Sequence, residues 1–72
     1  MSTSVNAKLV GKIVSIDVKV GDQVKKNDVL GLMEATKMNV KIFAPKEGTV
    51  KEVHVGPGDH VNMKTTIVTL DD

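Results

Sequence analysis

Residues 11–24 read GKIVSIDVKVGDQV, and residues 48–61 read GTVKEVHVGPGDHV. A shift of 37 positions lays the first stretch on the second and matches the apolar positions, two glycines and a Gly-Asp pair. This agreement of several features in one register indicates an internal repeat. We therefore expect a single domain over residues 1–72, built from two quasi-repeats of about 1–36 and 38–72.

Both repeats are rich in Val, Ile and Thr, whose stiff branched side chains favour strands over helices. Apolar and polar residues alternate in both halves, which is typical of strands that turn one face to a core and the other to water. The positions predicted to face the core are Ile16, Val18 and Val20 in the first half and Met38, Val40, Ile42 and Ala44 in the second. Gly21-Asp22 and Gly58-Asp59 follow apolar runs and are expected to form equivalent turns.

The alternation slips once in each half, at equivalent places. Ile13 and Ile16 are three residues apart, and so are Val50 and Val53. This spacing predicts a pair of β-bulges, which let short sheets curl and protect their edges. The expected fold is all-β: a flattened barrel or sandwich of two four-stranded antiparallel sheets with internal pseudo-twofold symmetry, a barrel-sandwich hybrid.

The same symmetry predicts where Lys37 lies. Its partner under the shift falls just beyond the chain ends, so the turn around Lys37 and the paired termini should occupy opposite ends of the molecule. Glu34-Ala35-Thr36-Lys37-Met38 must reverse the chain there, although it contains no glycine or asparagine to take a positive φ easily.

Composition excludes several functions. The net charge is +1 and Phe43 is the sole aromatic residue, which argues against nucleic-acid binding. No apolar run is long enough to insert into a membrane and no secretory signal opens the chain, so a cytoplasmic location is expected. His54 and His60, without any cysteine, make a poor metal site, and Asp22 and Asp59 are expected to be structural.

Residues 34–38 give the strongest indication of function. In this segment the chain resembles the biotinyl/lipoyl attachment-domain family, and more closely its biotin carboxyl carrier branch, whose motif usually reads Glu-Ala-Met-Lys-Met. Glu34, Ala35, Lys37 and Met38 match this motif, while Thr36 replaces its first methionine. The resemblance continues downstream and covers almost the whole chain, with matches at Ala44-Pro45, Gly48, Val50, Val53, Val55, Gly58-Asp59 and Val61.

The resemblance implies a non-catalytic carrier. A biotin protein ligase would join biotin to the Lys37 amine, and Glu34, Ala35, Thr36 and Met38 would contribute to ligase recognition. The attached biotin would then carry a carboxyl group from a biotin carboxylase to a carboxyltransferase or decarboxylase subunit.

Three alternatives remain open at this point. The chain could be a lipoyl carrier of a 2-oxo acid dehydrogenase or glycine-cleavage system, although Thr36 and Met38 fit the lipoyl motif poorly. It could be a cofactor-free interaction module, although no long heptad helix accompanies it. Lys37 alone could also be an ordinary solvated turn lysine, and Met33 and Met38 could simply fill gaps in the core.

Overall fold

The computed structural model describes all residues, 1–72, as eight β-strands joined by turns and contains no helix. The strands are β1 (Ser2–Asn6), β2 (Gly11–Ile16), β3 (Gln23–Val24), β4 (Val29–Ala35), β5 (Met38–Phe43), β6 (Gly48–Val53), β7 (His60–Val61) and β8 (Thr66–Asp71).

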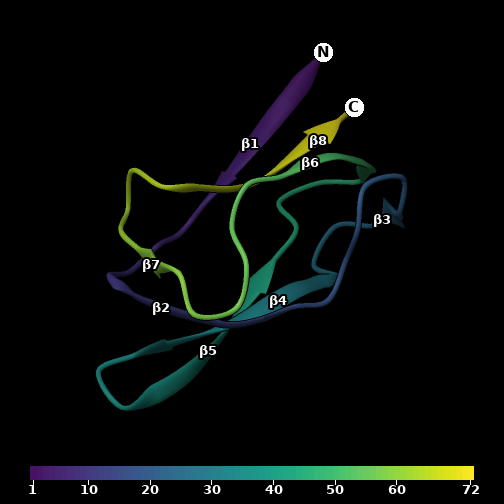
Figure 1. Cartoon of the computed structure of the whole chain (residues 1–72). Coiled ribbons are helices and arrows are strands. Elements are labelled where there is room, and N and C mark those ends of the chain that lie inside the picture. The colour runs from purple at the N-terminus through teal and green to yellow at the C-terminus, as the bar shows by residue number, and fades with distance from the viewer.

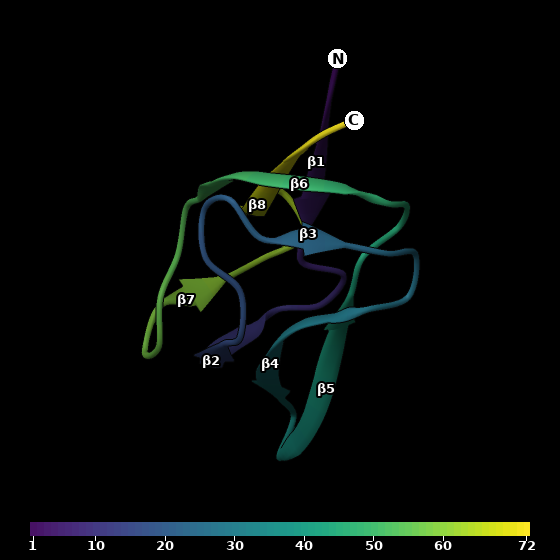
Figure 2. The same ribbon diagram turned by 90° about the vertical axis from the view of Figure 1, so that its right-hand side faces the viewer.

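The strands form two four-stranded antiparallel sheets that face each other (Figures 1 and 2). One sheet has the order β1-β8-β6-β3 and the other β5-β4-β2-β7. The expected all-β fold of two four-stranded antiparallel sheets is therefore confirmed. No pairing joins one sheet to the other, so the molecule is an open sandwich and not a closed barrel.

The shift of 37 residues converts one sheet into the other. It maps β1 onto β5, β8 back onto β4, β6 back onto β2 and β3 onto β7, which preserves the strand order. Turn hydrogen bonds repeat in the same way: the Asp22 carboxylate accepts from the Lys19 backbone N–H at 3.0 Å, and the Asp59 carboxylate accepts from the Gly56 N–H at 2.9 Å. Asp22 and Asp59 thus have the structural role that their turn positions predict.

The predicted pair of bulges is also present. The register between β2 and β4 shifts between Ile13 and Ser15, and the register between β6 and β8 shifts at the equivalent step, between Val50 and Glu52. A β-bulge increases local twist, and here it lets each short sheet wrap around the shared core.

The core lies between the sheets and consists of aliphatic side chains from both halves. Its most deeply buried large side chains are Ile13, Leu30, Met33, Val50, Ile67, Val68 and Leu70. Two residues predicted to face the core do not lie in it. Val20 is 63% exposed because β2 ends at Ile16 and Val20 lies in the following turn, and Met38 is 65% exposed because it borders the hairpin turn, beyond the edge of the facing sheet.

The chain termini and the β4–β5 hairpin project from opposite ends of the molecule (Figure 1), as the symmetry predicts. β1 and β8 pair side by side at the terminal end, and the Asp72 backbone N–H donates to the Met1 carbonyl at 3.0 Å. The molecule is elongated, with extents of 33 × 18 × 16 Å. No helix of a length and hydropathy suited to crossing a membrane occurs in the structure.

Candidate functional site

Lys37 lies at the tip of the hairpin formed by β4 and β5. Ala35 pairs with Met38, which leaves Thr36 and Lys37 as a two-residue loop. Both loop residues have positive φ, 47° for Thr36 and 63° for Lys37. Positive φ at both central residues is the signature of a type I′ turn, whose twist matches that of the flanking strands. The pairing of β4 with β5 therefore imposes a backbone conformation that neither side chain favours.

The Lys37 side chain has no partner within the protein. It is exposed, and the one ion pair of the structure joins Lys46 to Asp72 at the opposite end. No side-chain hydrogen bond involves Lys37 either. A lysine with a flexible four-carbon stem and no partner can extend fully into solvent or into the active site of another protein.

The residues beside Lys37 divide into an outward and an inward set. Glu34, Thr36 and Met38 are exposed, whereas Ala35 is 4% exposed and Met33 only 2%. Met33 therefore belongs to the core, and Ala35 is buried at the last position of β4 before the turn. Four residues around Lys37 are predicted to contribute to recognition by the ligase. Three of them, Glu34, Thr36 and Met38, are exposed and accessible to another protein.

The base of the hairpin is held by β2. Lys12 pairs with Glu34, and a β-carbon added at Gly11 would overlap the backbone carbonyl of Glu34. Glycine at position 11 is thus what allows β2 to approach the hairpin so closely. The β2 contact and the buried Met33 together give the flexible Lys37 side chain a rigid base.

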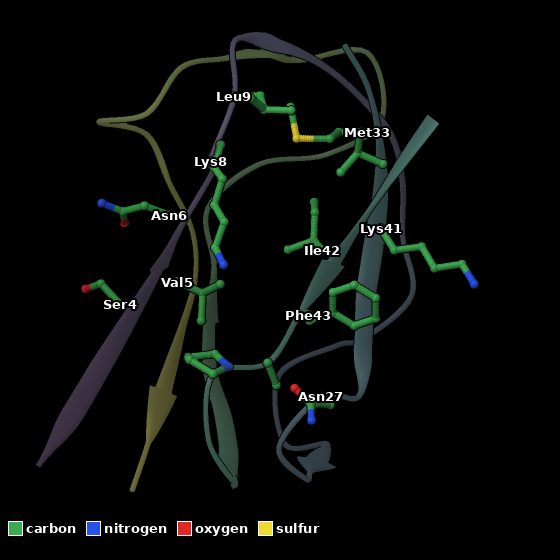
Figure 3. Close-up of a pocket in the computed structure, with 14 residues that line it drawn as sticks. Ser4, Val5, Asn6, Lys8, Leu9, Asn27, Met33, Lys41, Ile42 and Phe43 are labelled. Atoms are coloured by element: carbon green, nitrogen blue, oxygen red, sulfur yellow. The ribbon is translucent and has the colours of Figure 1, made fainter. Parts of the chain in front are cut away.

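An open groove, which sequence analysis did not predict, lies between edge strands of the two sheets. It has a volume of about 490 Å³ and lies between β1 and β5, which the pseudo-twofold relates to each other (Figure 3). Leu9 and Met33 lie together at one end of the groove, and Phe43 and Asn27 lie toward the other. The charged residues of its lining, Lys8 and Lys41, are both basic. Because the two sheets do not pair here, this feature depends on their separation, which sequence periodicity does not specify.

The remaining polar residues have local roles. His54 Nε2 lies 2.8 Å from Thr69 Oγ1 on the neighbouring strand β8. At the terminal end, a hydrogen bond from Lys46 and, to a smaller extent, one from Thr3 hold the pKa of the Asp72 carboxyl below its usual value. These contacts fasten strands to one another and lie away from Lys37.

Comparison with known proteins agrees with this geometry. The family model described as "Biotin-requiring enzyme" matches residues 1–70. The biotin/lipoyl attachment protein of Bacillus subtilis is 33% identical over 69 residues, which cover 96% of this chain and 94% of that protein. The biotin carboxyl carrier protein of Streptococcus mutans is 39% identical over 64 residues, which cover 89% of this chain but 49% of that protein.

Solved structures share the fold. A region of Kluyveromyces lactis urea carboxylase superposes with a TM-score of 0.91 at 22% identity, covering 99% of this chain and 6% of the enzyme. The lipoyl domain of the 2-oxoglutarate dehydrogenase complex from Azotobacter vinelandii superposes with a TM-score of 0.74 at 19% identity, covering all of this chain and 94% of that domain. A carboxylase and a lipoyl domain therefore both contain this sandwich.

Proposed function

This chain belongs to the biotin/lipoyl attachment-domain family, and from that premise we propose that it is a biotin carboxyl carrier with biotin bound covalently to Lys37. The observation that supports the proposal most directly is the position of Lys37, exposed and without a partner at the tip of a tight hairpin. Its neighbours Glu34, Ala35 and Met38 match the biotinyl motif.

Attachment requires a separate enzyme. Lysine amines have pKa values of ~10.4 and are mostly protonated at neutral pH. No side-chain hydrogen bond or ion pair links Lys37 to a group that could remove the proton. A biotin protein ligase supplies an activated biotinyl group and takes the amine into its own site. The amine nitrogen attacks the activated carbonyl, loses a proton and forms an amide as the activating group leaves.

The hairpin then determines how the biotin is used. Acylation removes the positive charge of Lys37 and extends it into a long tether on a rigid base. The tether allows biotin to receive a carboxyl group at a biotin carboxylase and to release it at a carboxyltransferase or decarboxylase. Confinement on a tether raises the local concentration of the carried group to roughly millimolar, provided that both sites lie within reach.

A lipoyl carrier is the second candidate. A dihydrolipoyllysine-residue acetyltransferase of Acholeplasma laidlawii is 32% identical over 62 residues, covering 86% of this chain and 11% of that protein. Biotinyl and lipoyl groups are attached through the same lysine chemistry, so side chains that flank the lysine must distinguish them. Met38, directly after Lys37, favours biotin.

Intact mass measurement tests the proposal. The chain is produced with biotin ligase and biotin, and in parallel with lipoate ligase and lipoate, and the modified peptide is mapped. We expect one biotinyl increment, located on Lys37. The matched variant Lys37→Ala should remain folded by circular dichroism and should gain no increment, because an exposed turn side chain contributes little packing. A lipoyl increment with no biotinyl increment, or labelling at another lysine, contradicts the proposal.

A further inference from the structure

One face of β5 forms an apolar track that leads from the hairpin tip into the groove between β1 and β5. Met38, Val40 and Ile42 alternate along this strand and therefore share a face. Their exposure falls from the tip inward: Met38 is 65% exposed, Val40 is half-buried and Ile42 is 7% exposed. Val40 and Ile42 also line the groove. The exposed apolar residue beside Lys37 is thus the outer end of a surface that continues into a cavity.

The near end of the groove lies within reach of a group attached to Lys37. Met33 and Val40 both line the groove and pair with each other in the β4–β5 ladder. Val40 follows Lys37 by three residues, which span about 10 Å in a strand. A biotinyl group joined to the lysine has about ten bonds between the backbone and its ring, and these extend to about 12 Å. The ring can therefore reach the groove without any change in the backbone.

The lining of the groove suits an apolar ring with a polar edge. Its volume of about 490 Å³ is typical of small-molecule sites. β1 and β5 are the outer strands of their sheets, and edge strands leave backbone N–H and carbonyl groups unpaired. Lys8 lines the β1 side, where Figure 3 shows its side chain extended along the groove with the amine directed toward Val5. No ion pair or side-chain hydrogen bond engages this amine.

Charge determines which form of Lys37 enters the groove. The charged residues of the lining, Lys8 and Lys41, are both cations, and no carboxylate lies among them. The free Lys37 amine is also a cation at neutral pH, so the groove repels it and the side chain stays in solvent. Acylation removes that charge and adds an apolar ring. The carboxyl group that biotin would carry is an anion, which the two lysines attract.

We propose that the groove between β1 and β5 is a docking site in which the biotinyl group of Lys37 lies between its visits to other enzymes; this inference rests on the proposed function. The apolar track holds the valeryl chain and the ring, and Lys8 donates to the ureido oxygen. The covalent link identifies the occupant, because a tether keeps the group at a local concentration of roughly millimolar or above. Even a weak site is occupied at that concentration. Lys37 is therefore accessible before acylation and sheltered after it.

Amide NMR spectra of the chain before and after biotinylation test the position of the ring. We expect resonance shifts at Lys8, Val40 and Ile42, together with nuclear Overhauser effects between the ring protons and the Ile42 methyl groups. The control Lys37→Gln removes the charge without adding biotin, and it should shift only resonances at the hairpin tip. Biotinylation should also raise the melting temperature of the wild type, since a docked group stabilises the folded state.

The rate of capture by streptavidin tests the contacts. Lys8→Glu reverses a charge in the groove, and Val40→Thr introduces the residue found at the equivalent position of β1, Thr3. Lys51→Glu, at an exposed position of β6 outside the groove, is the matched control for Lys8→Glu. Only the undocked fraction reacts, so we expect capture of the biotinylated protein to be about threefold faster for Lys8→Glu and Val40→Thr and unchanged for Lys51→Glu.

Three results overturn the docking site. They are groove resonances that biotinylation does not shift, capture rates of the Lys8 and Val40 variants equal to that of the wild type, and an equal acceleration in Lys51→Glu, which would assign the effect to net charge. Each of these leaves the proposed function intact, because Lys37 still carries biotin. If the wild-type chain gains no biotinyl increment at all, the proposed function fails and the docking site fails with it.

Discussion

Gly11 on β2 lies against the backbone carbonyl of Glu34 on β4, three residues before Lys37, so closely that a β-carbon at position 11 would overlap the carbonyl oxygen. The equivalent contact in the other half is looser, with a β-carbon at Gly48 lying 3.0 Å from the Asp71 carbonyl oxygen. The tighter contact is at the base of the hairpin that carries Lys37, and the looser one is beside the free termini.

The substitution Gly11→Ala is therefore expected to be more damaging than Gly48→Ala. Overpacking against backbone atoms cannot be relieved by a change of rotamer, so we expect a loss of about 3 kcal/mol for Gly11→Ala and about 1 kcal/mol for Gly48→Ala. Urea denaturation of both variants measures the difference. Equal losses would show that the hairpin base is no more tightly packed than the terminal end.

The turn at the hairpin tip gives a second prediction. Thr36 and Lys37 have positive φ, which costs a branched residue such as threonine about 1 kcal/mol relative to asparagine or glycine. Thr36→Asn should raise the free energy of unfolding by up to about 1 kcal/mol in chemical denaturation. Asn27, which already has a φ of 73°, supplies the control: Asn27→Thr should destabilise by a similar amount. If Thr36→Asn leaves stability unchanged or lowers it, the positive φ at Thr36 is not a source of strain.

Thr36→Met restores the usual biotinyl motif and gives a third prediction. Methionine lacks the branched β-carbon and adds an exposed apolar group beside Met38. We expect the rate of biotinylation at Lys37 to stay the same or to increase. A marked decrease in the rate, with the fold retained, would mean that the ligase reads position 36 differently from the motif.

Much of the fold could be predicted from the sequence because each structural signal occurs twice, once in each repeat. The spacing from Ile13 to Ile16 predicts one bulge and the spacing from Val50 to Val53 predicts its equivalent, and both occur. Gly21 and Gly58 both have the positive φ of a turn, 98° and 93°. Features present in both halves are thus predictable from local pattern.

Features present in only one half were harder to predict. Neither Thr36 nor Lys37 favours the positive φ that their turn requires. Pairing of the flanking strands therefore determines the turn conformation, and local backbone preference does not. Val20 and Met38 follow the apolar alternation but are exposed, because each lies where a strand has ended or passes the edge of the facing sheet. The groove between β1 and β5 depends on how far apart two unpaired edges lie.

The turn carboxylates give a fourth prediction. Asp22 and Asp59 accept backbone N–H groups in equivalent turns, at 3.0 and 2.9 Å. Each alanine substitution should lower the free energy of unfolding by about 1 kcal/mol, as expected for one such hydrogen bond. The sites share no partner, so the double variant should lose the sum of the two. Chemical denaturation of the three variants provides the measurement, and a combined loss well above that sum would indicate coupling between the halves.

The fifth prediction concerns acid stability at the terminal end. Hydrogen bonds from Lys46 and Thr3 hold the pKa of Asp72 below its ordinary value of 3.8. A carboxyl whose pKa is lower in the folded state stabilises the fold fully above its unfolded pKa, and the contribution is lost as the pH falls through the folded pKa. Wild type should therefore be more stable than Asp72→Asn near neutral pH, and the difference should shrink below about pH 3.8. Melting temperatures across this range provide the measurement. Lys46→Met should remove most of the same increment, and little further loss is expected when both changes are combined, because the two side chains stabilise the strand ends through one shared contact.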